Sequence, residues 1–208
     1  LLFNSDARFL DNSFKDLLDV LEQDETVGIV AGEMLSTGHR HVESCFGFPS
    51  FFELLRDFSI DLIYKIGKGS RGSKRCEVTT VQGITGHEVD WASGAYLFVR
   101  RELMRGANIL DERIFMYFED TLLCRHAWQK GYRVLCLDTA PIFHEGGGSF
   151  RKVNNVKAVY GYRSSRTYIE ELYGAKGLWW YERLIRLTWY SLLPPLLILG
   201  LVGFGGIG

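Results

Sequence analysis

Two adjacent carboxylates, Glu119 and Asp120, are the residues of this chain best suited to acid–base chemistry. They follow an apolar, aromatic run (115–118) and precede a segment (121–130) whose apolar residues recur at helical spacing. We therefore expect the pair at the N-terminus of a helix, where the dipole favours ionised carboxylates and the apolar wall opposes them. A carboxylate under such opposing influences can act as a general base. The alternative is an ordinary capping role in the first helical turn.

A second group of polar residues points to metal or phosphate binding. Asn4 and Asp6 follow a short apolar segment (1–3) that resembles the end of a strand. In α/β sheets ligands bind at the carboxyl ends of strands, and a carboxylate there can hold Mg²⁺ or Mn²⁺. His144 ends another short strand pattern before three glycines, where an imidazole can ligate a metal beside a loop that wraps a diphosphate. Simple turn and exit-loop chemistry explains both segments equally well.

The segments that must position these side chains alternate between helix and strand patterns, which predicts an α/β fold. Gly131 stands where a left-handed helix cap is expected. A helix with a serine cap is predicted at 13–23, and further helices are predicted to begin at 48–50, 100–102 and 121. Strands are predicted at 1–3, 27–31, 96–99 and 132–137.

Composition narrows the class of protein. The chain has 208 residues, 47% of them hydrophobic, and a formal net charge of −1, which suits one domain with an appendage and gives no support to nucleic-acid binding. It begins with Leu rather than Met, and we expect a fragment of a longer protein. Four scattered cysteines without a Cys-x-x-Cys pair predict reduced, structural thiols in a cytosolic compartment.

The C-terminal part has a different character. Tryptophans, tyrosines and arginines mix over 179–190, as at a membrane–water interface, and 187–208 contains no charged residue. This stretch is long enough to begin a membrane span, and the preceding arginines predict a catalytic domain on the cytoplasmic side. A buried core helix is the alternative. A basic segment at 65–75 suits an anionic lipid or acceptor, or a solvated loop.

Five short motifs occur together in a recognisable order. They are Asn-x-Asp-Ala (4–7), Val-Asp-Trp-x-Ser-Gly-Ala (89–95), Phe-Met-Tyr-Phe-Glu-Asp (115–120), Gly-Tyr-Arg-Val (131–134) and a histidine before glycines at 144. Over roughly residues 1–150 the chain resembles family 2 glycosyltransferases, and most closely their rhamnosyltransferase-like branch. Linked motifs in the family's order are far more specific than any one of them.

The resemblance implies the C-terminal portion of a GT-A fold, a Rossmann-like domain with a mixed sheet, without its N-terminal nucleotide-binding half. We expect this portion at 1–150, a helical linker at 151–178, and an interfacial helix with the start of a transmembrane segment at 179–208. The implied activity moves a sugar from a nucleotide-sugar donor, with inversion and a Mg²⁺ or Mn²⁺ cofactor. The implied acceptor is a glycan or lipid-linked precursor of cell-envelope polysaccharide, at the cytoplasmic face of the membrane.

The resemblance also assigns roles to the catalytic and donor residues. Asp120 would be the base that deprotonates the acceptor hydroxyl, with Glu119 positioning the acceptor. Asn4 and Asp6 would form the donor and metal site, and His144 would contact the metal or the diphosphate.

The segment around 90–95 would line the acceptor side through Asp90, Trp91, Gly94 and Ala95. Its small residues also suit a place where a ligand or another backbone comes close. A tryptophan face suits a sugar ring, although a core tryptophan is an equally good interpretation of Trp91.

Two departures from the family pattern leave alternatives open. Members of the branch often carry a second acid where this chain has Leu122, and a proline where it has Ser5. A non-catalytic, membrane-anchored module that binds a glycan or nucleotide is therefore the main rival. A metal-dependent phosphohydrolase is a further rival, which would need more ligands than Asp6 and His144, and the sequence offers no His-x-Asp motif.

Overall fold

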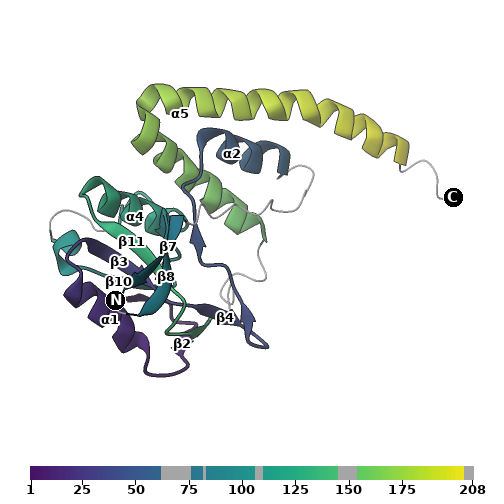
Figure 1. Cartoon of the computed structure of the whole chain (residues 1–208). Coiled ribbons are helices and arrows are strands. Elements are labelled where there is room, and N and C mark those ends of the chain that lie inside the picture. Colours follow the sequence, from purple (N-terminus) through teal and green to yellow (C-terminus); the bar gives the residue numbers. More distant parts are fainter. Residues whose placement is uncertain (62–75, 82, 106–109, 145–153, 204–208) are drawn as a thin grey trace. The chain divides into compact units, whose positions relative to one another are not determined.

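The computed structural model describes residues 1–61, 76–81, 83–105, 110–144 and 154–203. These residues form two compact units. Figure 1 shows the chain with colours that follow the sequence. Unit 1 contains the described residues of 1–48 and 70–164, and unit 2 those of 49–69 and 165–208. The basic segment 65–75 and the glycines at 146–148 lie outside the described residues.

Unit 1 is a mixed α/β fold built on a six-stranded sheet. In sheet order its strands are β1 (Leu2–Phe3), β10 (Tyr96–Val99), β3 (Val27–Ala31), β11 (Arg133–Leu137), β8 (Ile84–Glu88) and β7 (Cys76–Val81). Strands β3 and β11 pair in parallel, and the other neighbours pair antiparallel. Because β1 and β3 both run antiparallel to β10, strands β1, β3 and β11 point the same way. Their carboxyl ends, and the start of β10, therefore share one edge of the sheet.

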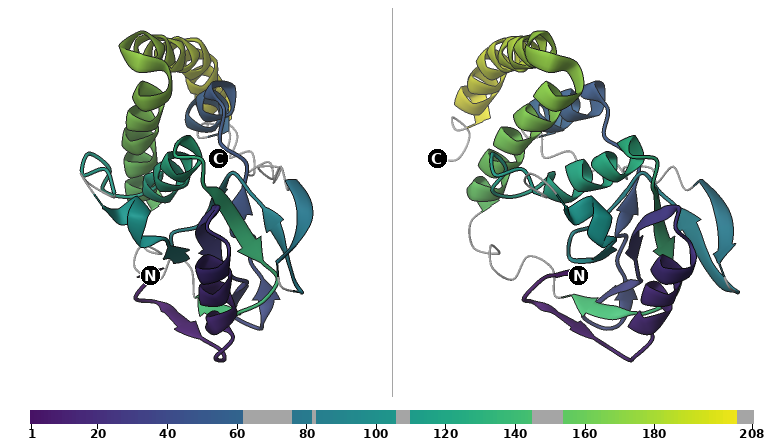
Figure 2. Two further views of the ribbon diagram at one scale, coloured as in Figure 1. Left: turned by 60° about the vertical axis from the view of Figure 1, so that its left-hand side comes forward. Right: turned by 90° about the vertical axis from the view of Figure 1, so that its left-hand side faces the viewer.

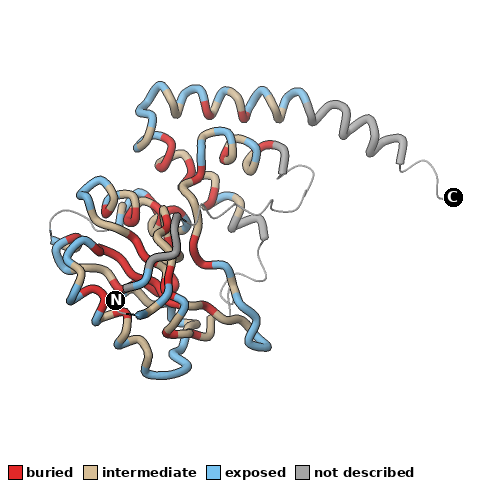
Figure 3. Tube along the Cα trace, in the orientation of Figure 1, coloured by how far each residue is buried: buried red, intermediate tan, exposed pale blue. Residues whose placement is uncertain are grey.

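Helices cover both faces of this sheet, as Figure 2 shows for α1 (Phe14–Gln23) and α4 (Glu119–Gln129). Alternate residues of a strand face opposite sides. Val30 packs in one core with the apolar face of α1, and Ile29 packs in the other core with α4. All five residues of β3 are buried, as expected for a central strand covered on both faces (Figure 3).

Most of the helices and strands expected from the sequence are present. Gly131 has φ +82°, which confirms the left-handed cap after α4. The helix opening at 100–102 is a short 3₁₀ turn, η2 (Arg101–Met104). Ser13 occupies the N-cap position of α1 as predicted, but its side chain makes no capping hydrogen bond, because its hydroxyl donates to Asp11 Oδ1 instead.

Two small sheets bring together segments that are distant in sequence. The four-stranded sheet has the order β2-β12-β4-β5, and the two-stranded sheet pairs β6 with β9. Their strands are β2 (Ala7–Phe9), β12 (Ile142–His144), β4 (Met34–Ser36), β5 (Arg40–His41), β6 (Cys45–Phe46) and β9 (Trp91–Ala92). The pairing of β2 with β12 places the segment that follows β1 against His144.

The cysteines correct one prediction. Cys45 and Cys136 form a disulfide between β6 and β11, so the expectation that the thiols are all reduced is wrong. Cys124 is a buried free thiol, as predicted, and burial raises its pKa. The argument from cysteine usage for a reducing compartment therefore loses its basis.

Unit 2 is helical in its described part. It contains α2 (Phe51–Arg56), the π-helical turn η1 (Asp57–Asp61) and the part of α5 (Asn154–Gly203) that begins at residue 165. The helix predicted to open at 48–50 is confirmed as α2, which begins with a capping box between Ser50 and Glu53. The hydroxyl of Tyr181, a buried residue, lies 3.4 Å from the Leu54 carbonyl oxygen.

Residues 151–153 and 204–208 of the predicted C-terminal segments lie outside the described residues. Helix α5 covers the rest of both segments, the linker predicted at 151–178 and the interfacial helix predicted from 179. It is interrupted at Gly174, whose φ of +67° is not helical. Among the described residues, no helix has the length and apolar character needed to cross a membrane.

Candidate active site

Two predicted site residues, Asn4 and Asp120, are both hydrogen-bonded to the loop that enters β10, at the shared edge of the sheet. The backbone N–H of Asn4 donates to the carbonyl oxygen of Ala95 at 3.1 Å. The backbone N–H of Gly94 donates to Asp120 Oδ2 at 2.9 Å. One short loop thus joins the segment that follows β1 to the carboxylate at the start of α4.

The entry into α4 is held in an unusual backbone conformation. Tyr117 and Phe118 have φ values of +67° and +72°, in the left-handed region that side-chain-bearing residues rarely adopt. The buried Phe118 ring and a hydrogen bond of 2.7 Å from Ser164 Oγ to the Met116 carbonyl oxygen hold this turn. Such strain persists where surrounding contacts determine it, and it clusters at functional sites. Here it sets the direction of the helix that begins with Glu119.

Asp120 is enclosed by donors and by a close glycine. Its Oδ1 accepts from the backbone N–H of Thr121 at 2.7 Å, while Oδ2 accepts from Gly94. A Cβ atom at position 94 would lie 3.2 Å from the Asp120 Cβ, which is tighter than ordinary packing. The small residue predicted at 94 therefore makes room for the Asp120 side chain itself.

Burial dominates the electrostatics of the pair. It raises the pKa of Asp120, although the N–H groups of Gly94 and Thr121 lower it. Burial raises the pKa of Glu119 too, and the neighbouring Asp120 charge adds to that effect. Glu119 Oε2 is buried and has no hydrogen-bond partner among the described residues. Both groups therefore take up a proton more readily than exposed carboxyls do.

The three residues predicted for metal and diphosphate binding lie together. His144 Nε2 is 3.2 Å from Asp6 Oδ1 and 3.4 Å from Asn4 Nδ2. The β2–β12 ladder creates this cluster, since it places His144 opposite Ala7.

The ligand atoms of this cluster can be compared with those that divalent ions prefer. No group of three or more His, Cys, Asp or Glu side chains suited to a metal occurs in the described part of the chain. Mg²⁺ is commonly held by one or two carboxylates with substrate phosphates and water, and imidazole is also a ligand for transition metals. Asp6 and a bound diphosphate would supply the oxygen ligands that Mg²⁺ or Mn²⁺ prefers, and His144 could add a nitrogen ligand to a transition ion such as Mn²⁺. Neither residue could hold the ion alone.

Two predicted acceptor residues are engaged in local structure. Asp90 Oδ2 accepts the backbone N–H of Phe48 at 2.8 Å. The Trp91 ring packs on Phe46 at 4.7 Å, and its indole N–H donates to the Gly47 carbonyl oxygen at 2.8 Å. These side chains fasten the 46–48 segment beside β9, in line with the alternative of a structural tryptophan. Their acceptor role stays a prediction.

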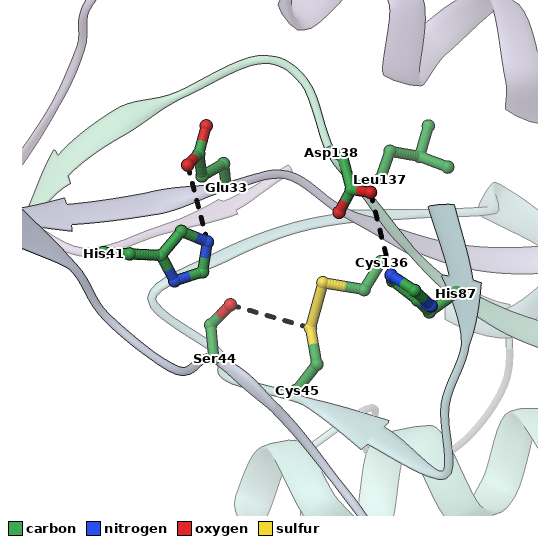
Figure 4. Close-up of a pocket in the computed structure, with 8 residues that line it drawn as sticks. All are labelled: Glu33, His41, Ser44, Cys45, His87, Cys136, Leu137 and Asp138. Atoms are coloured by element: carbon green, nitrogen blue, oxygen red, sulfur yellow. Dashed lines mark hydrogen bonds and ion pairs between the residues drawn. A yellow bond between two sulfur atoms is a disulfide. The ribbon is translucent and has the colours of Figure 1, made fainter. Parts of the chain in front are cut away.

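A cavity of about 280 Å³ lies at the carboxyl ends of β3 and β11, among residues that the sequence reasoning did not select as a site (Figure 4). Glu33 and Asp138 follow these two strands almost directly. Ligands bind at such strand ends in α/β sheets, and that signal could have identified both acids. Its lining residues are Glu33, His41, Ser44, Cys45, His87, Cys136, Leu137 and Asp138.

Comparison with known proteins adds no assignment. No protein-family model matches the chain, and a search of curated proteins returned no significant match. The functional argument therefore rests on the residues and their geometry.

Proposed function

We propose that the chain is the C-terminal part of a family 2 glycosyltransferase domain with the GT-A fold. It would transfer a sugar from a nucleotide-sugar donor to a hydroxyl of a glycan or lipid-linked acceptor, with inversion. The observation that carries the proposal is the loop 93–95. It is bonded on one side to the Asn4 segment and on the other to Asp120, so that a phosphate-binding cluster and a base would serve one reaction.

The base would be Asp120. During transfer the acceptor hydroxyl attacks the anomeric carbon, its proton passes to the Asp120 carboxylate, and the bond from that carbon to the donor diphosphate breaks. Burial raises the pKa of Asp120, which favours uptake of that proton. The N–H of Gly94 holds the carboxylate in place, and Glu119 beside it would position the acceptor.

The diphosphate would leave at the Asn4–Asp6–His144 cluster. A Mg²⁺ or Mn²⁺ ion held by Asp6 and His144 would stabilise negative charge on the diphosphate as a Lewis acid. Asn4 adds an amide donor that can bond a phosphate oxygen.

The C-terminal helix supports a membrane location for this activity. Trp179 and Trp180 are 49% and 55% exposed, and the Arg183 guanidinium lies 5.0 Å from the Trp179 ring. Exposed tryptophans beside arginine are typical of a helix at the membrane interface. We place the acceptor, a cell-envelope glycan precursor, at the cytoplasmic face of that membrane.

The test is nucleoside diphosphate release by the full-length protein in detergent with Mg²⁺ or Mn²⁺. UDP-, dTDP- and GDP-sugars would be offered with a lipid extract as the acceptor source. We expect release from one donor class and a loss of about 10²–10⁴-fold in Asp120→Asn, with donor binding retained. Glu22→Gln, an exposed carboxylate on α1, is the matched control and should be fully active. Equal turnover by Asp120→Asn would refute the base assignment.

A further inference from the structure

The cavity at the carboxyl ends of β3 and β11 is separate from the Asn4–Asp6–His144 cluster and is lined by other residues. Glu33 and His41 form one wall, with His41 Nε2 3.4 Å from Glu33 Oε1. His87 and Asp138 form another, with His87 Nε2 3.7 Å from Asp138 Oδ2. Figure 4 shows the two imidazole–carboxylate pairs on opposite sides of the cavity, with the Cys45–Cys136 disulfide and Ser44 between them.

The cavity adjoins the loop that holds Asp120. The carbonyl oxygen of Ser44 accepts the backbone N–H of Ser93 at 2.8 Å. The next residue, Gly94, donates to Asp120. The disulfide ties the following residue, Cys45, to β11, so the Ser44 wall is covalently fixed to the sheet. A ligand in the cavity would therefore sit against the chain segment that positions the proposed base.

The lining defines the chemistry of that ligand. No lysine or arginine is among the described lining residues, and two carboxylates are, so an anionic group such as a phosphate is not favoured there. The two acid–imidazole pairs offer carboxylate acceptors and ring nitrogens that can donate or accept. Neighbouring hydroxyl groups of a sugar ring match this set, because each can donate to a carboxylate and accept from an imidazole N–H.

Size and access agree with one small ring. At about 280 Å³ the cavity is slightly smaller than the roughly 300–1,000 Å³ typical of ligand pockets, which suits one ring rather than a longer ligand. Among the lining side chains, those of His41 and Asp138 are 58% and 56% exposed, while that of His87 is only 17% exposed. A ring can enter past the exposed pair and meet the inner imidazole.

We propose that this cavity is an acceptor subsite that binds one neutral sugar ring of the acceptor glycan. Glu33 and Asp138 accept hydrogen bonds from its hydroxyls, and His41 and His87 complete the contacts. The assignment rests on the proposed glycosyl transfer, and it names the part of the acceptor that this chain recognises.

Binding of simple glycosides by the full-length protein, without any donor, tests the subsite. The probes are methyl glycosides of glucose, galactose, mannose and rhamnose, followed by saturation-transfer NMR and titration. We expect saturable binding of at least one probe, weakened tenfold or more in Glu33→Ala/Asp138→Ala. Glu33→Gln/Asp138→Asn keeps hydrogen-bonding side chains and should retain part of the affinity. Glu22→Gln, with an exposed acid outside the cavity, should bind as the unaltered protein does.

Two results would overturn the subsite: no saturable binding of any probe, or equal binding by folded Glu33→Ala/Asp138→Ala. Thermal unfolding of each variant establishes that it is folded. Asp120→Asn separates this proposal from the proposed function, because it should lose transfer and still bind the glycoside. Transfer activity without glycoside binding would disprove the subsite alone, and glycoside binding without transfer from any donor would disprove the proposed reaction alone.

Discussion

At the scale of single residues, the most consequential atom of the site is Glu119 Oε2. It is buried without a hydrogen-bond partner among the described residues, beside a second carboxylate. A buried charged oxygen without a partner lowers the free energy of unfolding, because its desolvation is not offset. Proteins often retain such a destabilising group where function requires it.

Removing this charge should stabilise the protein in a pH-dependent way. Burial raises the folded-state pKa of Glu119 above its ordinary value of 4.5. The stability linked to the protonated form is therefore fully present below pH 4.5 and is lost as the pH rises through the folded pKa. We expect Glu119→Gln to raise the free energy of unfolding by about 1–2 kcal/mol at pH 7. The gain should disappear below pH 4.5.

Urea unfolding from pH 4 to 8 measures this difference, with Glu22→Gln as an exposed control that should show none. A constant gain across the whole range would mean that the carboxylate charge is not its cause. Since Glu119 is proposed to position the acceptor, the same variant should lose transfer activity while it gains stability.

At the scale of elements, the disulfide between β6 and β11 holds the Ser44 segment in place. It closes a sequence separation of 91 residues, which removes much conformational freedom from the unfolded chain. It also fixes the segment whose partner strand, β9, leads into the Gly94 loop.

Reduction of the Cys45–Cys136 disulfide should therefore destabilise the folded protein. We expect dithiothreitol to lower the free energy of unfolding by about 2–4 kcal/mol. The measurement is urea unfolding with and without the reductant, with free thiols counted in both samples. A Cys45→Ala/Cys136→Ala variant should start at the lower stability and be insensitive to the reductant. A reduced protein with two more thiols and unchanged stability would contradict the expectation.

Local patterns allowed many of these elements to be predicted. The apolar spacing of 13–23 and the buried run 27–31 correspond to α1 and β3, and Gly131 ends α4 as expected. These features depend on neighbours in the sequence, which a pattern can show.

Contacts made by tertiary pairing were harder to predict. Cys45 meets Cys136 only because separate ladders bring β6 and β11 together, and no spacing in the sequence records that. The left-handed entry at Tyr117 also has no local signal, since neither it nor Phe118 is a glycine. The clustering of Asn4, Asp6 and His144 was expected from the resemblance, and the β2–β12 ladder is its physical basis.

At the scale of the whole molecule, the exposed tryptophans of α5 predict association with lipid. Inserting two partly exposed rings into an interface should contribute on the order of 1.4 kcal/mol or more, about tenfold in affinity. We expect Trp179→Ser/Trp180→Ser to weaken binding to anionic phospholipid vesicles by that factor. Co-sedimentation measures it. Phe52→Ser, which removes an aromatic that is 75% exposed on α2, is the control and should bind normally. Equal binding by the tryptophan variant would exclude these rings as the contact.

The pairing of distant strands also governs how the chain reaches its folded state. Leu2 lies opposite Leu97 in the sheet, and Val27 lies opposite Arg133, so its ladders close late and slowly. The third cysteine, Cys124, is only twelve residues upstream of Cys136, whereas the native partner, Cys45, is far away in the chain. An oxidant that acts before the ladders close can join Cys124 to the wrong partner. The yield of native protein should therefore depend on whether oxidation is slower than assembly of the sheet.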